Sequence, residues 1–198
     1  MRALTDNELT SIIEAMERGS EGRATEAGVT YRANPRVATA LKFQALTGLR
    51  IGDVLSLKLN SFKSERGNIR FDITEEKTGK KRVFDVPPAA YNMLTAYAME
   101  RGITDKNAFL FAGKDGSHIT ARAVQKYLAI VCEDLGIDDV STHSFRKWYA
   151  TDKYNRSGHN IEAVRQLLQH SSTTITQRYL GVTDEEVNAL ARSATLPF

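Results

Sequence analysis

The sequence contains little of what would mark an extracellular or membrane-bound chain. Only one cysteine, Cys132, occurs among 198 residues, so no disulfide can form within the chain and a reducing compartment is expected. No apolar run approaches the roughly 20 residues that cross a bilayer, and residues 1–9 are too polar for a secretory signal. We therefore expect a cytoplasmic protein with no membrane partner, in which Cys132 is a buried and unreactive thiol.

An excess of charge of one sign is also nearly absent. The 27 basic and 24 acidic residues leave a net charge of +3 and a pI near 9.0, which by itself favours a nucleic-acid partner only slightly. The positions of the basic residues are more informative, because they gather in residues 77–82 and in residues 146–156. Each cluster could contact phosphate or could be a solvated face, and the sequence leaves both alternatives open.

Helical spacing of apolar residues, combined with capping residues, predicts most of the secondary structure. A chain of this length with 41% hydrophobic residues can bury a core, and one compact domain over residues 1–198 is expected. A polar loop is predicted over residues 18–32. The predicted helices begin after Thr5, Asn34, Arg50, Pro88, Thr120, Thr142, Asn160 and Thr183.

Strand predictions rest on alternation of apolar and polar residues. Residues 68–74 and 83–86 alternate in this way around a basic turn, which predicts a hairpin with Lys77 and Lys80 near its tip. Residues 109–111 form a further strand candidate. The expected fold is therefore mainly α with a small antiparallel β-sheet, an α+β class.

A short polar run near the C-terminus combines residues suited to phosphoryl transfer. His143-Ser-Phe-Arg146 is followed by His170 and then by Arg178-Tyr179. A tyrosine hydroxyl has a pKa near 10, so it attacks phosphorus well only where a neighbour takes its proton and cations hold the developing charge. Arginine can donate to two phosphate oxygens at once and keeps its charge at physiological pH. The polar turn at 171–174 leaves room for a short helix that returns Tyr179 towards His170.

This run resembles the C-terminal signature of the tyrosine recombinases, the phage integrase family. Two upstream segments extend the resemblance: Leu46-Thr-Gly-Leu-Arg50-Ile-Gly-Asp53 is similar to the first arginine box, and Glu76-Lys77-Thr-Gly-Lys80 is similar to the hairpin with the catalytic lysine. The resemblance covers residues 4–187 and implies the fold of the DNA breaking-rejoining enzymes. Taken singly, each of these residues could instead be a solvated turn or helix-end residue.

The resemblance implies a site-specific DNA recombinase that works through a 3′-phosphotyrosyl intermediate and needs no metal or other cofactor. It assigns catalytic roles to Arg50, Lys77, His143, Arg146, His170 and Tyr179, with Tyr179 as nucleophile and Lys77 as general acid, a role for which Lys80 competes. Asp53 stands where the family more often has Glu and would support the arginine or cap a helix. Gln169 stands where glycine is common. Candidate DNA contacts are Lys80, Lys81, Arg122, Lys126 and Lys147.

Double-stranded DNA is the partner that the resemblance implies. Family members usually carry an additional N-terminal DNA-binding domain, and the chain starts almost at the catalytic region, so we expect that domain to be absent and an accessory domain or protein to help binding. The chain is expected to be either an excised catalytic fragment or one that resembles the compact single-domain members of the family. We expect a tetramer on DNA, a free chain that could be monomeric, and a C-terminal segment, residues 184–198, that docks on a neighbouring protomer or packs on its own core. The alternative function is a non-catalytic DNA-binding or regulatory protein with a recombinase-like fold.

Overall fold

The structure is a computed structural model, and it describes residues 2–20, 30–74, 77, 79, 81–82, 84–181 and 192. The chain divides into two compact units, Met1–Tyr149 and Ala150–Phe198, and the division falls inside helix α6. Each unit is described by itself. Three predictions lie outside the described residues: the helix after Thr183 with its docking segment, Lys80, and most of the loop at 18–32.

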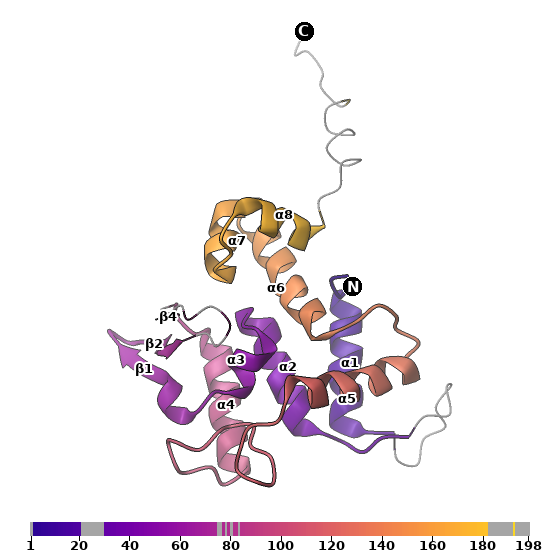
Figure 1. Cartoon of the computed structure of the whole chain (residues 1–198), viewed down its shortest axis with the longest axis vertical. Helices are drawn as coiled ribbons and strands as arrows, with labels where there is room; N and C mark the ends of the chain where they lie inside the picture. Colours follow the sequence, from indigo (N-terminus) through magenta and orange to yellow (C-terminus); the bar gives the residue numbers. More distant parts are fainter. Residues whose placement is uncertain are drawn as a thin grey trace. The chain divides into compact units, whose positions relative to one another are not determined.

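Helices form most of the first unit, at the positions that the capping residues predict (Figure 1). Thr5 caps the first helix in a complete capping box with Glu8, and the Asn34 side chain accepts a hydrogen bond from the Val37 N–H at the start of the second. The helices are α1 (Asp6–Arg18), α2 (Pro35–Thr47), α3 (Ile51–Leu55), α4 (Pro88–Glu100), α5 (Ala121–Asp134) and the first half of α6 (Thr142–Arg156).

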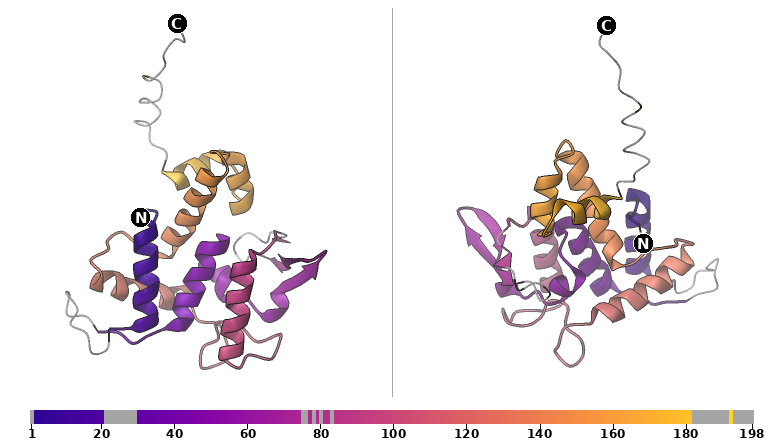
Figure 2. Two further views of the ribbon diagram at one scale, coloured as in Figure 1. Left: turned by 180° about the vertical axis from the view of Figure 1, so that it is seen from behind. Right: turned by 45° about the horizontal axis from the view of Figure 1, so that its top comes forward.

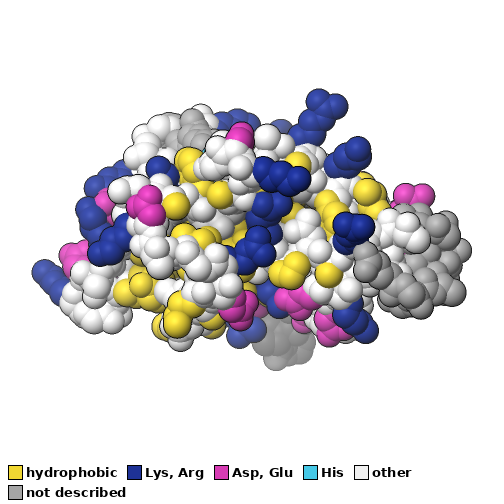
Figure 3. All heavy atoms as spheres, turned by 90° about the horizontal axis from the view of Figure 1, so that it is seen from below, with side chains coloured by type: hydrophobic (Ala, Val, Ile, Leu, Met, Phe, Trp, Pro, Cys, Tyr) yellow, Lys and Arg dark blue, Asp and Glu magenta, His cyan; other side chains and the backbone are white. Residues whose placement is uncertain are grey.

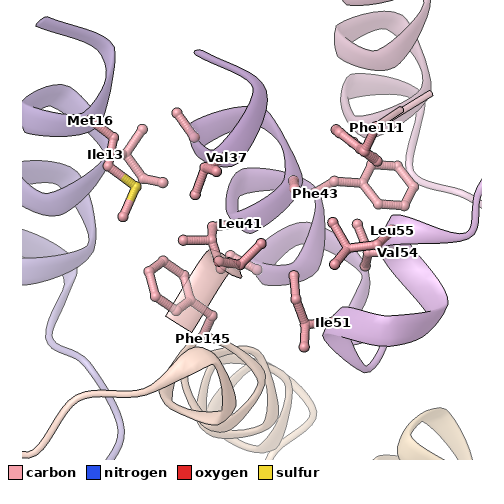
Figure 4. Packing of buried hydrophobic residues seen from close by; sticks show 14 of the residues in the cluster. Ile13, Met16, Val37, Leu41, Phe43, Ile51, Val54, Leu55, Phe111 and Phe145 are labelled. Carbon is pink, nitrogen blue, oxygen red and sulfur yellow. The ribbon is translucent and has the colours of Figure 1, made fainter. Parts of the chain in front are cut away.

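Helix α2 forms the centre of the first unit. Leu41 and Phe43 are fully buried, and they pack between α1 on one side and α3 on the other, with Phe145 of α6 below them (Figure 4). Nine residues of α2 are buried, including Ala38 and Ala40, whose small side chains allow neighbouring helices to approach closely. Because α2 is held on all sides, the residues that follow it have a fixed position.

The β-structure consists of two short antiparallel pairs, which confirms a small antiparallel sheet but changes its strands. Strand β1 (Phe62–Glu65) pairs with β2 (Asn68–Phe71), and β3 (Ile73–Thr74) pairs with β4 (Lys81–Arg82). Figure 2 shows the first pair extending away from the helices of this unit. The turn between β1 and β2 is Arg66-Gly67, both with positive φ (51° and 83°), a geometry that matches the twist of a hairpin.

The strand predictions differ from the structure in two places, at β1 and at residues 109–111. Strand β1 was not predicted, because a single apolar residue, Phe62, gives no alternation to detect. The predicted hairpin between residues 68–74 and 83–86 is confirmed, although its named strand β4 lies at 81–82. Asp85 forms a bridge with Arg70, the Phe71 N–H donates to the Phe84 carbonyl, and the Val86 N–H donates to the Ile69 carbonyl. Residues 109–111 form no strand. Phe109 forms one isolated bridge with Lys58. Leu110 and Phe111, in the turn that follows Phe109, are buried, which explains why this segment is apolar.

The second unit contains the remainder of α6 with α7 (Ile161–Leu168) and α8 (Thr173–Leu180). Asn160 and Ser172 cap α7 and α8, each by accepting a hydrogen bond from a backbone N–H of the first turn. The two helices lie side by side (Figure 1). None of the helices in the described parts of the two units is long and apolar enough to span a membrane.

Candidate active site

Gly48 fixes the backbone beside two of the predicted catalytic arginines. It ends α2 in the left-handed conformation (φ 65°, ψ 16°), which glycine adopts without strain. A Cβ atom at this position would lie 2.3 Å from Cδ1 of Tyr149. The tyrosine ring therefore lies directly against the Gly48 backbone, and only a hydrogen atom fits between them. After this turn Arg50 adopts an extended conformation and begins α3, at the junction that the sequence predicts.

Arg146 lies in the interior of the first unit. Only 2% of its surface is exposed, and its Nη1 donates a hydrogen bond to the Gly48 carbonyl at 2.5 Å. Arg146 and Tyr149 are three residues apart, so they lie on one face of α6 and both contact residue 48. The sequence placed Arg146 on a face of α6 away from the core residues, and its burial was not foreseen. This anchoring holds a positive charge at the Gly48–Arg50 turn.

Asp53 lies one helical turn after Arg50. Its carboxylate is 3% exposed, and Oδ2 lies 3.9 Å from Nη1 of Arg50, which is half-buried. At this separation the contact is electrostatic rather than a short hydrogen bond. Asp53 therefore lies where it can orient the Arg50 guanidinium.

His143 lies at the start of α6 among positive charges of the first unit. Protein atoms that displace water from part of its exposed ring lower its pKa below the ordinary 6.5, and nearby cations lower it further. These cations are Arg146, Lys77, Arg50 and Lys147, in decreasing order of effect. The fold thus gathers four predicted catalytic residues, Arg50, Lys77, His143 and Arg146, into one electrostatic group that we call the cation cluster.

We expect NMR titration to place the pKa of the His143 imidazole below 6.5, because protonation would add a positive charge to the cation cluster. Lys77→Gln should raise that pKa by removing one charge, whereas Lys63→Gln, outside the cluster, should not change it. Because the pKa of His143 is lower in the folded than in the unfolded protein, the contribution of His143 to the free energy of unfolding is complete above pH 6.5. It is lost as the pH falls through the folded-state pKa. A measured value above 6.5 would contradict this electrostatic grouping.

The predicted DNA contacts have different environments. Lys77 is exposed in the turn between β3 and β4. Lys81 pairs with Asp72 at 3.2 Å, and Asp72 also pairs with Lys63. Arg122 and Lys126 are exposed on α5, one turn apart, and Lys147 is half-buried near His143. Asp72 was missed by the sequence reading, because nothing in the sequence shows that it faces two lysines.

His170 and Tyr179 meet in the second unit. Their ring centroids are 5.3 Å apart and the ring planes are inclined at 76°. His170 Nδ1 lies 3.1 Å from the hydroxyl oxygen of Thr176, a fully buried residue, and the backbone carbonyl of His170 accepts a hydrogen bond from Arg165. The short helix returns the tyrosine to the imidazole as predicted. Thr176 was missed, although its position three residues before Tyr179 places it on the same face of α8.

Gln169 shows why glycine suits the position before the second histidine. It ends α7 in the left-handed conformation, with φ 55° and ψ 35°, and its N–H bonds to carbonyl groups of the last helical turn. This conformation costs a residue with a Cβ atom about 1–2 kcal/mol. The left-handed residue turns the chain so that His170 follows directly.

We expect Gln169→Gly to raise the free energy of unfolding by about 0.5–1 kcal/mol. Glycine removes the cost of the positive φ, but it loses more backbone entropy on folding than glutamine does, which offsets part of the gain. Gln166→Gly makes the same replacement inside α7 and should lower it by about 1 kcal/mol. Urea denaturation followed by circular dichroism measures both changes. Equal destabilisation by the two variants would show that the left-handed geometry carries no cost at residue 169.

The single cysteine lies outside the cation cluster and the His170–Tyr179 pair. Cys132 is 5% exposed on α5, and burial raises the pKa of its thiol to about 12, which confirms a buried and unreactive cysteine. Within the described ranges, no group of three or more His, Cys, Asp or Glu side chains could hold a metal ion.

Comparisons with known proteins identify relatives of this chain. The model of the phage integrase family matches residues 2–186. Tyrosine recombinase XerA of Pyrococcus furiosus is 25% identical over 198 residues, which cover 98% of this chain and 62% of XerA. Tyrosine recombinase XerC of Leptospira interrogans is 31% identical over 150 residues, which cover 75% of this chain and 47% of XerC. The chain spans about half the length of several curated relatives that it matches.

Solved structures share the fold. The XerH site-specific recombinase bound to its palindromic difH substrate matches with a TM-score of 0.71 and 22% identity, over 96% of this chain and 52% of XerH. XerA recombinase matches with a TM-score of 0.67 and 20% identity, over 99% of this chain and 65% of the other. The mainly helical fold with its small antiparallel sheet is therefore that of the tyrosine recombinase catalytic domains. Because the family model matches residues 2–186, nearly the whole chain, the chain belongs to the phage integrase family, the tyrosine recombinases.

Proposed function

We propose that this chain is the catalytic part of a site-specific recombinase that cuts and rejoins double-stranded DNA through a 3′-phosphotyrosyl intermediate. The observation that carries the proposal is the pairing of Tyr179, near the end of α8, with His170, with 5.3 Å between their ring centroids. The pair places a tyrosine that could attack phosphorus beside an imidazole that could bind the same phosphate. It accompanies a cation cluster in the same chain.

In the proposed reaction the Tyr179 oxygen attacks phosphorus and the bond from phosphorus to the 5′-oxygen breaks. The tyrosine proton leaves to a base, and Lys77 donates a proton to the departing 5′-oxygen, since an alkoxide is too basic to leave unaided at neutral pH. A 5′-hydroxyl from the same or a partner strand reverses the step. Phosphoester bonds are exchanged one for one, so no energy source is consumed.

Arg50 and Arg146 would stabilise the negative charge that grows on the non-bridging oxygens. Preorganised donors of this kind are effective because they need no rearrangement during the reaction, and removing one typically costs about a hundredfold or more in rate. Asp53, beside Arg50, would act as a positioning residue. The anchoring of Arg146 on the Gly48 carbonyl supplies the required rigidity.

The two histidines would have separate roles. The lowered pKa of His143 keeps its imidazole neutral near pH 7, a state that can accept the tyrosine proton or donate one N–H to phosphate. His170, oriented through Thr176, would donate to a non-bridging oxygen. No metal ion or other cofactor enters the proposed reaction, since the arginines supply the charge that metal ions provide in two-metal nucleases.

The same proposal includes the partners expected from the sequence. Double-stranded DNA would be contacted through Lys80, Lys81, Arg122, Lys126 and Lys147. Recombination would take place in a tetramer on DNA, with residues 184–198 docking on a neighbouring protomer and an accessory domain or protein assisting DNA binding. The protein would act in the cytoplasm.

A suicide-substrate assay tests the proposal. Nicked duplexes drawn from repeats that flank the gene, together with a randomised pool, are incubated with the protein in EDTA and separated on denaturing gels. We expect a protease-sensitive covalent adduct, with peptide mass spectrometry placing the DNA on Tyr179. A protein that retards these duplexes but forms no adduct with any of them would instead be the non-catalytic DNA-binding alternative.

A further inference from the structure

A pocket lies in the first unit, away from the cation cluster. It has a volume of about 410 Å³, within the range of about 300–1,000 Å³ typical of small-molecule sites, and it is formed by the start of α2, the end of α4 and the loop that follows α4. Arg36 lies at the start of α2 and Arg50 lies just beyond its end, and a helix of 13 residues is about 20 Å long at 1.5 Å per residue.

Two arginines without acidic partners line this pocket. Nη1 of Arg36 donates to the Ala112 carbonyl at 2.5 Å, which holds the guanidinium on the pocket wall. Arg101, directly after α4, is exposed. Within the described part of the chain neither arginine forms an ion pair. Figure 1 places the loop after α4 at the lower edge of this unit, and Figure 3 shows Lys and Arg side chains across the middle of the face seen from below.

Tyr97 adds a hydroxyl group to the same pocket. Its side chain is 5% exposed and its ring stacks on Phe111 at 5.6 Å. Burial raises the pKa of this hydroxyl, and the charges of Arg101 and Arg36 act in the opposite direction, so both guanidiniums lie near it. Among the described residues the hydroxyl has no hydrogen-bond partner. The hydroxyl can therefore form a hydrogen bond with a group bound in the pocket.

Asp105 restricts the kind of ligand. Its carboxylate lines the pocket, and Oδ1 accepts a hydrogen bond from the Asn107 N–H at 2.8 Å. A ligand that carried only negative charge would be repelled by this group. A ligand with hydroxyl groups beside its anionic group would instead donate hydrogen bonds to the carboxylate, as ribose hydroxyls do to acidic residues in nucleotide sites.

We propose that this pocket binds a small phosphate ester that carries hydroxyl groups, a sugar phosphate or a ribonucleotide. The phosphate would accept hydrogen bonds from Arg36, Arg101 and the Tyr97 hydroxyl, and a sugar hydroxyl would donate to Asp105. Arginine guanidiniums bind phosphate through paired, charge-assisted hydrogen bonds. The site is separate from the DNA-cleaving residues and does not depend on the proposed function.

Isothermal titration calorimetry with ribose 5-phosphate, inorganic phosphate and ribose tests the proposal on the full chain. We expect saturable binding of ribose 5-phosphate, weaker binding of phosphate and none of ribose. Arg101→Gln should weaken binding at least about tenfold, and Tyr97→Phe, which keeps the ring packing, about threefold to tenfold. Arg18→Gln removes an exposed arginine on α1 and should leave the affinity unchanged.

Two outcomes would overturn the proposal. The first is an absence of saturable ribose 5-phosphate binding up to about 10 mM in a protein with a cooperative thermal melt. The second is that a short DNA duplex displaces ribose 5-phosphate and that Arg101→Gln weakens binding of the duplex and of ribose 5-phosphate equally. This result would show that the pocket binds the phosphates of the DNA backbone. The variant Tyr179→Phe should bind ribose 5-phosphate as tightly as the parent, so failure of the recombinase proposal leaves this result intact.

Discussion

Replacing Tyr179 by phenylalanine is expected to abolish the covalent DNA adduct completely. The substitution removes only the hydroxyl oxygen that would attack phosphorus, and α8 contains no second tyrosine. The ring remains, so its packing against His170 is retained and the free energy of unfolding should change by less than about 1 kcal/mol. Denaturing gels measure the adduct, and gel retardation measures binding of DNA without cleavage.

A matched control for this variant exists in the same unit. Tyr154 lies beside His159 with ring centroids 4.9 Å apart, so Tyr154→Phe removes a hydroxyl from a second histidine–tyrosine pair. This control should keep full adduct formation. An adduct that persists in Tyr179→Phe but disappears in Tyr154→Phe would show that Tyr154, and not Tyr179, is the nucleophile.

Replacing Gly48 by alanine is expected to cause the largest loss of stability, about 2–5 kcal/mol. The positive φ costs alanine about 1–2 kcal/mol, and a Cβ atom 2.3 Å from Cδ1 of Tyr149 forces an overpacked contact that costs about 1–3 kcal/mol more. Such a loss is a large fraction of the roughly 5–15 kcal/mol that stabilises a typical domain. Urea or thermal denaturation measures it.

Gly102→Ala separates the two contributions. Gly102 has nearly the same φ, 66°, but no atom lies within 4 Å of the position of its Cβ, so this variant should lose only the conformational part. Similar losses in the two variants would show that Tyr149 yields without cost. Conditions in which Gly48→Ala is still folded provide a second readout: cleavage should fall about a hundredfold, because the carbonyl that anchors Arg146 is displaced.

Helix positions could be predicted from the sequence because helix ends depend on local chemistry. Thr5, Asn34, Thr120 and Asn160 each accept a hydrogen bond from a backbone N–H three residues later, a contact within one turn that needs no distant partner. Strands depend on pairing with other segments. Strand β1 was therefore missed, and the apolar residues 109–111 were assigned a strand that they do not form.

The identities of the candidate site residues were predicted from sequence for a different reason. The order of Arg50, Lys77, Arg146 and Tyr179 along the chain resembles a family pattern, and the matched family model supports that membership. Their environments were not readable. Nothing in the sequence indicates that Thr176 contacts His170, or that Asp72 lies between two lysines.

The sequence by itself determined the family and the residue types for phosphoryl transfer, since these depend on the order of residues along the chain, and it determined the starts of the helices, since each is encoded within a few neighbouring residues. Only the tertiary structure decided that Arg146 is buried on the Gly48 carbonyl, that the Tyr149 ring excludes any side chain there, and that four cations lower the pKa of His143. These features depend on packing between α2 and α6, which are about a hundred residues apart along the chain. Burial and charge are properties of surroundings, and surroundings exist only after the chain has folded.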